Sequence, residues 1–141
     1  MKIYLAAPWG YRFDAAMFGE MLVKAGHTLT EPWWNHREVG GYPGPPNGAQ
    51  QIELTEQADK DWDGVEACDV MVVLQLGLSE GKAVEQGLAL AYDKPIIVVS
   101  PEDKRGHIFH YMTDHFTFVR TIGEAIDELS RRASHGNITK V

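Results

Sequence analysis

The sequence predicts an α/β fold, a single-domain three-layer α/β/α sandwich around a mainly parallel sheet of about five strands. Short apolar runs alternate along the chain with longer segments of helical periodicity. Residues 69–76 and 95–100 are apolar almost throughout, as strands buried on both faces of a parallel sheet are. The length of 141 residues matches one domain, so we expect residues 1–141 to fold as a unit.

Each element follows from periodicity and from the residues that interrupt it. The apolar runs predict strands at residues 2–7, 27–31, 69–76, 95–100 and 116–119. Apolar residues at helical spacing predict helices over residues 13–25, 49–67, 81–92 and 121–133. Gly26 and Pro95 end the first and third helices, and Asn47 is expected to cap the second.

Two segments are expected to lack regular structure: the Gly- and Pro-rich residues 33–48, and the polar tail 134–141, which we expect to be flexible. Right-handed crossovers between the strands would give a Rossmann-like (flavodoxin-like) sheet with helices on both faces. Ligands of such sheets bind beyond the carboxyl ends of the strands. This rule selects residues 8–13, 33–48 and 77–85.

Composition excludes several classes of protein. The formal net charge of −7 disfavours a nucleic-acid polymer as partner, because phosphate backbones favour clustered Lys and Arg. Cys68 is the only cysteine, which excludes an internal disulfide and fits a reducing compartment. No apolar stretch reaches the roughly 18 residues of a membrane helix, and the N-terminus does not read as a signal peptide. We therefore expect a cytoplasmic protein without a membrane partner.

Several cofactor and metal motifs are absent from the sequence. There is no GxGxxG and no GxxxxGK[ST], which disfavours a dinucleotide-binding dehydrogenase or a P-loop enzyme. His107, His110 and His115 have neither the HExxH spacing nor companion cysteines of a zinc site. No GxSxG nucleophile elbow occurs. We expect no cofactor and no metal.

Two carboxylates are candidates for chemistry. Glu85 lies about one turn into the helix that follows the most apolar strand, where the helix start faces the crevice. The alternative is a solvated charged face of Glu80, Lys82 and Glu85. Asp61 precedes that strand, but Asp59, Asp63 and Glu66 surround it and equally fit a solvated acidic face. The pattern alone does not single out one of them.

Aromatic and basic residues follow the first two strands. Trp9 and Trp33, with their aromatic neighbours Tyr11, Phe13 and Trp34, are placed to stack on a nucleobase or to belong to the core. Arg12 and Arg37 are the candidate contacts for an anion.

Four motifs occur in a fixed order over most of the chain. They are IYLAAP in the first strand, Asp61 eight residues before the strand-opening Asp69, GxxxExG at Gly81, Glu85 and Gly87, and KPIIVV in the fourth strand. Together they resemble the nucleoside 2-deoxyribosyltransferase family and its relatives, the 2'-deoxynucleoside 5'-monophosphate N-hydrolases. The resemblance implies a small-molecule nucleoside or nucleotide as the partner.

The resemblance also implies roles for residues. Glu85 would be the nucleophile that attacks the anomeric carbon, Asp61 its catalytic partner, and Tyr4 would position the Glu85 carboxylate. Ser79 stands six residues before the nucleophile. At this position the hydrolases carry a Ser that contacts the 5'-phosphate, whereas the transferases carry an Asp that binds the 5'-hydroxyl. Gly81 would let the substrate approach the helix start.

In the family a residue from a neighbouring subunit completes the site. Counting along the sequence places that residue at His110, with Met112 nearby. The resemblance therefore implies a homodimer or higher homo-oligomer. Two features depart from the family: Gly10 stands where the hydrolases place an Arg, and residues 33–48 have no counterpart.

The expected function is cleavage of the N-glycosidic bond of a 2'-deoxynucleoside or its 5'-monophosphate through a covalent deoxyribosyl–Glu85 intermediate, with transfer to another base or to water. A non-catalytic nucleotide-binding sensor on the same fold is the main alternative. A phosphoribohydrolase of the lysine-decarboxylase-like type ranks last, because its Gly- and Thr-rich phosphate loop is absent.

Overall fold

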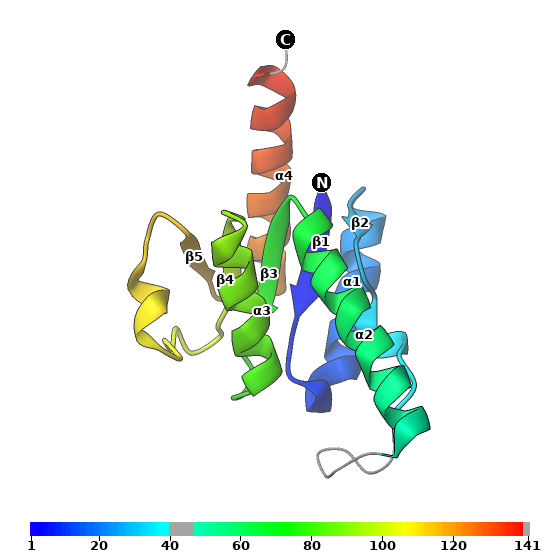
Figure 1. Ribbon diagram of the computed structural model, residues 1–141. Coiled ribbons are helices and arrows are strands. Elements are labelled where there is room, and N and C mark those ends of the chain that lie inside the picture. Colours follow the sequence, from blue (N-terminus) through cyan, green and yellow to red (C-terminus); the bar gives the residue numbers. More distant parts are fainter. Residues whose placement is uncertain (40–46, 140–141) are drawn as a thin grey trace.

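The computed structural model describes residues 1–39 and 47–139, and Figure 1 shows the arrangement of the elements. The strands are β1 (Lys2–Ala6), β2 (Thr28–Leu29), β3 (Val70–Leu74), β4 (Ile96–Val99) and β5 (Phe116–Val119). The helices are α1 (Arg12–Lys24), α2 (Gly48–Ala67), α3 (Glu80–Ala91) and α4 (Ile122–Thr139). Three short 3₁₀ turns are η1 (Trp9–Tyr11), η2 (Trp33–Asn35) and η3 (Ile108–Tyr111).

One sheet of five parallel strands forms the centre of the molecule. Its strand order is β2-β1-β3-β4-β5, with Tyr4 of β1 beside Met71 of β3. Helices α2 and α3 cover one face, and α1 and α4 cover the other (Figure 1). Strands β1, β3 and β4 are almost wholly buried because helices cover both faces. The predicted three-layer α/β/α fold is confirmed.

Capping residues fix where two of the helices begin. The Asn47 side chain accepts from the N–H of Gln50, and the Gln50 side chain accepts in return from the N–H of Asn47. Ser79 caps α3 with a single side-chain bond, since its Oγ accepts from the N–H of Lys82 at 3.2 Å. The predicted cap at Asn47 is confirmed, and α2 begins at Gly48.

The boundaries differ from the prediction in three places. α4 continues to Thr139, beyond the predicted end at residue 133. The second strand has only two residues. The predicted loop 33–48 opens with the turn η2, and its residues 40–46 lie outside the described residues, as do 140 and 141.

The topology fixes where a ligand can bind. The chain passes from β1 to β2 toward one edge of the sheet and from β3 to β4 toward the other edge. A crevice therefore opens beyond the carboxyl ends of β1 and β3. In Figure 1 these ends lie at the bottom, away from both termini. None of the helices in the described part of the chain is both long and apolar enough to cross a membrane.

Candidate functional site

The phenol of Tyr4 and the carboxylate of Glu85 form the centre of the candidate site. Tyr4 is fully buried in β1, and its hydroxyl donates a short hydrogen bond to Oε2 of Glu85, one and a half turns into α3. Burial and the nearby carboxylates Glu85 and Asp61 raise the pKa of Tyr4, so the phenol keeps its proton as a donor. The Glu85 side chain, half-buried, is thereby held in one orientation.

Gly64 of α2 permits the close approach of β1 and the chain after β2. A Cβ atom at Gly64 would lie 2.7 Å from Cβ of Glu31 and 3.1 Å from the ring of Tyr4. The first distance is shorter than real Cβ contacts and the second is tighter than most of them, so a side chain at this position would displace its neighbours. The absence of a side chain at this position lets α2 bring Asp61, one turn earlier, next to the Tyr4–Glu85 pair.

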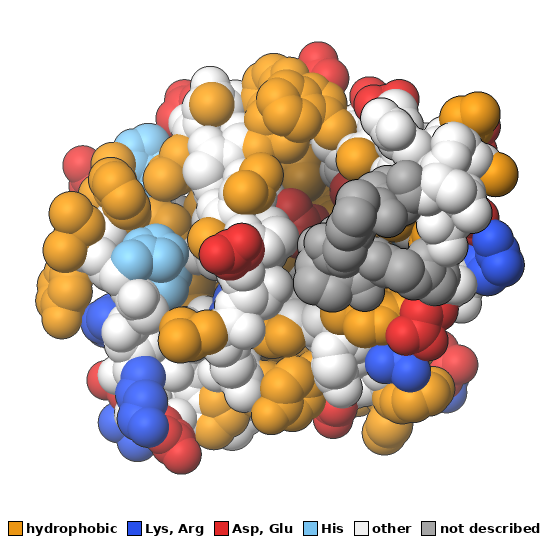
Figure 2. Space-filling model, turned by 60° about the horizontal axis from the view of Figure 1, so that its bottom comes forward, with side chains coloured by type: hydrophobic (Ala, Val, Ile, Leu, Met, Phe, Trp, Pro, Cys, Tyr) orange, Lys and Arg blue, Asp and Glu red, His pale blue; other side chains and the backbone are white. Residues whose placement is uncertain are grey.

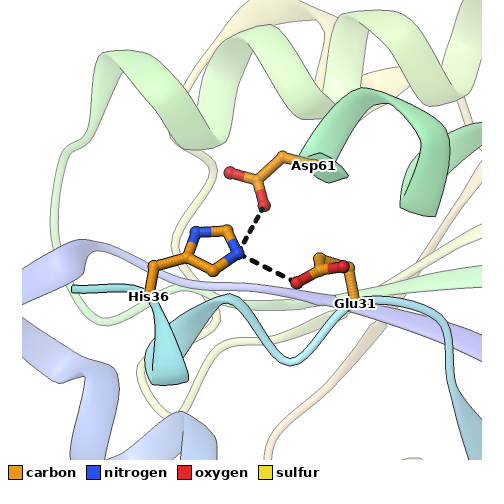
Figure 3. Close-up of side chains that lie close together, drawn as sticks. All are labelled: Glu31, His36 and Asp61. Carbon is orange, nitrogen blue, oxygen red and sulfur yellow. Dashed lines mark hydrogen bonds and ion pairs between the residues drawn. The ribbon is translucent and has the colours of Figure 1, made fainter. Parts of the chain in front are cut away.

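Asp61 belongs to a second polar cluster with Glu31 and His36 (Figure 3). Nε2 of His36 lies 2.9 Å from Oε1 of Glu31 and 4.0 Å from Oδ1 of Asp61. Oδ1 of Asp61 is buried and has no hydrogen-bond partner among the described residues. An unpaired buried oxygen of this kind is costly, so the site favours a ligand or a proton on Asp61.

The electrostatics of the two carboxyl groups are those of an acid–base pair. Burial raises the pKa of Glu85 to about 8, with the charge of Asp61 adding to the rise and the Tyr4 hydrogen bond opposing it. Burial also raises the pKa of Asp61 to about 6, against the lowering effect of His36. Two neighbouring carboxyl groups that share protons near neutral pH suit one acid and one nucleophile.

The predicted aromatic residues divide between core and surface. Trp33 is buried and its Nε1 donates to the carbonyl of Leu5 at 2.6 Å, so it is a core residue. Its ring lies 6.0 Å from that of Trp9, which is 39% exposed at the crevice. The guanidinium of Arg12 stacks on Trp9 at 5.0 Å. Of the two predicted Trp residues, Trp9 is the one available for stacking.

The start of α3 holds the two residues predicted to meet the sugar's 5' end. Ser79 accepts from the N–H of Lys82, and its carbonyl accepts from the N–H of Ala83. The N–H groups of Glu80 and Gly81 stay available to an acceptor, as in the first turn of any helix. A Cβ at Gly81 would have only the Ser79 hydroxyl nearby, at 3.8 Å, so the space above it is open.

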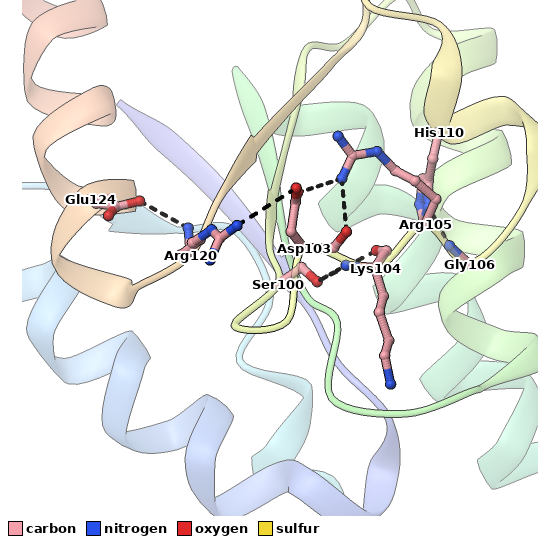
Figure 4. Close-up of polar contacts among 8 residues, drawn as sticks. All are labelled: Ser100, Asp103, Lys104, Arg105, Gly106, His110, Arg120 and Glu124. Atoms are coloured by element: carbon pink, nitrogen blue, oxygen red, sulfur yellow. Dashed lines mark hydrogen bonds and ion pairs between the residues drawn. The ribbon is translucent and has the colours of Figure 1, made fainter.

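His110 is held inside its own chain. Its Nδ1 accepts from the N–H of Gly106 at 2.9 Å, and its Nε2 lies 2.8 Å from Oε1 of Gln86. Figure 4 shows the Gly106 contact beside the ion pair of Asp103 with Arg105. Since both ring nitrogens are engaged and the side chain is buried, His110 is not exposed to a second subunit in this arrangement.

The face beyond the strands' carboxyl ends carries many apolar side chains, coloured orange in Figure 2. The apolar side chains of η3 and of the residue that ends it are exposed to solvent. They are Ile108 at 77%, Phe109 at 53%, Tyr111 at 71% and Met112 at 41% exposure. Met112, also predicted to reach a neighbour, is therefore accessible.

Residues 3–120 match the sequence profile described as nucleoside 2-deoxyribosyltransferase. The chain belongs to this family. Comparison with curated protein sequences gives no match. The family and the fold support an enzyme that cleaves or transfers at a glycosidic bond.

Solved structures of low sequence identity share the fold of this deoxyribosyltransferase-family chain. The 2-deoxyribosyltransferase of Bacillus psychrosaccharolyticus has a TM-score of 0.65 at 21% identity, with 89% of this chain and 90% of that chain covered. The CMP N-glycosidase BcmB of Clostridium botulinum has a TM-score of 0.56 at 19% identity, with 92% and 99% covered. The solution structure of BlsM gives 0.56 at 17% identity, with 89% and 85% covered.

The structure of this deoxyribosyltransferase-family protein rules out the two charged surface faces that the sequence left open as alternatives. Asp59, Asp63 and Glu66 are exposed, whereas Asp61 is half-buried against the site. The proposed charged face of Glu80, Lys82 and Glu85 does not exist, because Lys82 is buried. Arg37, a candidate anion contact, instead binds both carboxylate oxygens of Glu53.

Two residues of the site had no role assigned from the sequence: Glu31 and His36. Glu31 and His36 follow β2, so the rule that ligands bind beyond the carboxyl ends of strands was the signal that pointed toward them. Among the described residues, Glu31, His36 and Asp61 also form a group whose ligand atoms, all within 4.8 Å of one another, suit a divalent cation.

Proposed function

We propose that this chain cleaves the N-glycosidic bond of 2'-deoxynucleosides or their 5'-monophosphates, with Glu85 as the nucleophile. The observation that carries the proposal is the hydrogen bond from the buried Tyr4 phenol to Glu85, beside the half-buried Asp61. It fixes one carboxylate for attack and leaves a second as proton donor. The names of the structurally similar proteins, a 2-deoxyribosyltransferase and a CMP N-glycosidase, support this reaction class.

In the first step a carboxylate oxygen of Glu85 bonds to C1' of the sugar while the bond from C1' to the base nitrogen breaks. The bonding electrons go to the base, and Asp61 transfers its proton to that base. The transition state resembles an oxocarbenium ion, which the Glu85 carboxylate stabilises. Tyr4 orients the attacking oxygen and His36 supports the charge left on Asp61.

In the second step water or another base attacks C1', and the bond from C1' to Glu85 breaks. Asp61 takes the proton of the attacking group and so returns to its first state. Two displacements at C1' retain its configuration.

A substrate panel tests the proposal directly. We expect a deoxynucleoside or deoxynucleotide to release free base, and addition of a second base to give a new nucleoside or nucleotide if the intermediate admits it. Chromatography of the products, with and without added base, separates transferase from hydrolase. A protein that binds these compounds and releases no base from any of them would be a nucleotide sensor.

The pH dependence follows from the requirement for one ionised and one protonated carboxyl group. Since burial raises the pKa of Asp61 to about 6 and that of Glu85 to about 8, kcat/KM should rise through the lower value and fall through the higher one. These apparent values belong to the pair. The active form, with Glu85 ionised and Asp61 protonated, is the less populated of the two singly protonated forms, because burial gives Glu85 the higher pKa. In Asp61→Asn the alkaline limb should vanish, because no acid remains to lose its proton, and the maximum should drop about 10²- to 10⁴-fold. An alkaline limb that survives in Asp61→Asn would assign it to another group.

Ser79 gives a prediction about the substrate's 5' end. Its hydroxyl stands beside free N–H groups at the start of α3, a setting that favours a phosphate dianion. We expect the 5'-monophosphate to have a higher kcat/KM than its nucleoside. Ser79→Asp should reverse this order, because a like charge near the phosphate costs several kcal/mol. Ser79→Asn, which still caps the helix without a charge, is the matched control. A preference of the parent protein for the nucleoside would contradict the assignment.

The exposed residues of η3 support a shared site between subunits. We expect a dimer or larger homo-oligomer in light scattering, and Phe109→Asp with Tyr111→Asp should dissociate it because both side chains are mostly exposed in one chain. Activity should fall with dissociation if a neighbour's Met112 reaches the substrate. A parent protein that is a monomer with full activity would overturn this proposal.

A further inference from the structure

Glu31, His36 and Asp61 bring one nitrogen and two carboxylates together beside the Tyr4–Glu85 pair. Oε1 of Glu31 lies 2.9 Å from Nε2 of His36, and Oδ1 of Asp61 lies 4.0 Å from the same nitrogen (Figure 3). The three side chains come from separate segments, namely the chain after β2, the end of η2 and the middle of α2. No short motif spans them, so the cluster exists only in the folded protein.

The cluster lies in a part of the site that has more acidic than basic groups. Glu31, Asp61 and Glu85 all carry carboxyl groups, and none of the three forms an ion pair with a Lys or Arg among the described residues. The side chains of Glu31 and His36 are only 19% and 11% exposed, so water screens their charge in part. A bound cation would balance this charge.

Oδ1 of Asp61 is a second sign of a missing ligand. The atom is buried and has no hydrogen-bond partner among the described residues, although it lies on the side of Asp61 that faces His36 (Figure 3). Buried polar atoms nearly always have a partner, because a bare one loses its interaction with water and gains nothing in return. An ion bound between Asp61 and His36 would supply that partner.

The spacing of the three ligand atoms fits a transition-metal ion. All of them lie within 4.8 Å of one another. Zinc bonds to nitrogen and oxygen of about 2.0–2.1 Å place tetrahedral ligand atoms roughly 3.3 Å apart. The observed 2.9 Å and 4.0 Å lie on either side of that value, so small side-chain rotations complete the geometry. An imidazole with two carboxylates suits Zn²⁺ better than Mg²⁺, which prefers an octahedron of oxygen ligands.

We propose that Glu31, His36 and Asp61 bind Zn²⁺ and that the bound ion inhibits the enzyme. The binding site follows from the geometry, whereas the inhibition rests on the proposed function, in which Asp61 gives its proton to the departing base. A carboxylate that coordinates a metal is deprotonated and has no proton to donate. The positive charge of the ion would also oppose the oxocarbenium-like transition state at C1'.

Calorimetry with ZnCl₂ and metal-free protein tests the site in the absence of substrate. His36→Gln should weaken Zn²⁺ binding by at least about 10- to 100-fold, since the loss of even an outer-shell partner of a metal costs that much. MgCl₂ should bind much more weakly than ZnCl₂ to the parent protein. An equal Kd for Zn²⁺ in the parent and in His36→Gln would overturn the site.

His115→Gln is the matched control for this experiment. Nδ1 of His115 lies 3.9 Å from Oδ1 of Asp93, which gives a His–carboxylate pair at the surface without a third ligand among the described residues. Its replacement should leave the Kd for Zn²⁺ within about twofold, as substitutions away from a binding site do. A loss of affinity in His115→Gln equal to that in His36→Gln would mean that Zn²⁺ binds elsewhere, and would overturn the proposal.

The imidazole resonances of the parent protein give a measurement that does not depend on the folding of a variant. In protein labelled with ¹⁵N at histidine, ZnCl₂ should shift the Nε2 resonance of His36, because that nitrogen would bind the ion, and should leave the ring nitrogens of His115 unchanged. A spectrum in which Nε2 of His36 does not shift at saturating Zn²⁺ would overturn the proposal.

Base release then separates the inhibition from the binding. Saturating Zn²⁺ should lower kcat of the parent on its best substrate by about 10²- to 10⁴-fold, as the loss of a general acid does, and EDTA should restore it. His115→Gln should respond as the parent does. Full activity of a parent saturated with Zn²⁺ would overturn the inhibition. Failure to release base from any substrate would overturn the proposed function and the inhibition with it, whereas calorimetry would still decide the metal site.

Discussion

Glu85→Gln should abolish turnover and keep its fold. The amide is nearly isosteric with the carboxyl group and still accepts the hydrogen bond of Tyr4, but its oxygen is too weak a nucleophile to displace the base from C1'. Loss of a covalent nucleophile lowers kcat by about a thousandfold or more. The measurement is base release from the best substrate of the panel, together with circular dichroism and size-exclusion profiles that show an intact fold.

The chain offers a matched control for this experiment in Glu80, five residues earlier on α3. Glu80 is exposed and lies outside the Tyr4–Asp61 cluster, so Glu80→Gln should keep close to full activity. Mass spectrometry of protein quenched during turnover should find the deoxyribosyl group on the peptide that contains Glu85. Retained activity in Glu85→Gln, or a sugar attached to Glu80, would refute the nucleophile assignment.

The same substitution should stabilise the protein at alkaline pH. Burial raises the pKa of Glu85 to about 8 from its ordinary 4.5, so the folded state favours the protonated carboxyl. That contribution is fully present below pH 4.5 and is lost as pH rises toward 8, where the folded protein must hold a buried charge. The amide introduced by Glu85→Gln never ionises. Each pKa unit corresponds to about 1.36 kcal/mol, so the gain in unfolding free energy should reach a few kcal/mol above pH 8.

Urea denaturation of the parent and Glu85→Gln at pH 5 and pH 9 measures this difference. The two proteins should have similar stability at pH 5, and the variant should be more stable at pH 9. Asp63→Asn, which alters an exposed acid on α2, should show no such pH-dependent gap. A gap of equal size at both pH values would mean that packing and not ionisation separates the two proteins. The expected result would show that the buried Glu85 carboxylate lowers the stability of the protein, as functional groups in unfavourable environments commonly do.

Local sequence features determined the fold of this protein. The apolar runs around Val72 and Val98 predict buried parallel strands, because a strand that is covered on both faces has no solvent-exposed face that requires polar side chains. Asn47 marks the start of α2 because its side chain satisfies an N–H group that the helix itself leaves free. The segment from Ser79 to Gly87 identifies the family's motif and places it at the carboxyl edge of the sheet, where ligands of such folds bind.

The roles of the site residues depend on distances that the sequence does not contain. Asp61 differs from Asp59 and Asp63 only because it faces the interior. Glu31 and His36 join the site because Gly64 lets α2 approach them.

Lysine side chains usually lie at the surface, yet the packing of α3 on β3 buries Lys82 next to Gln75. The sequence by itself determined the elements and their order, since hydrophobic periodicity and capping act within a few residues. Only the tertiary structure decided which charges are buried together, because burial and electrostatic coupling arise between side chains that are far apart along the chain.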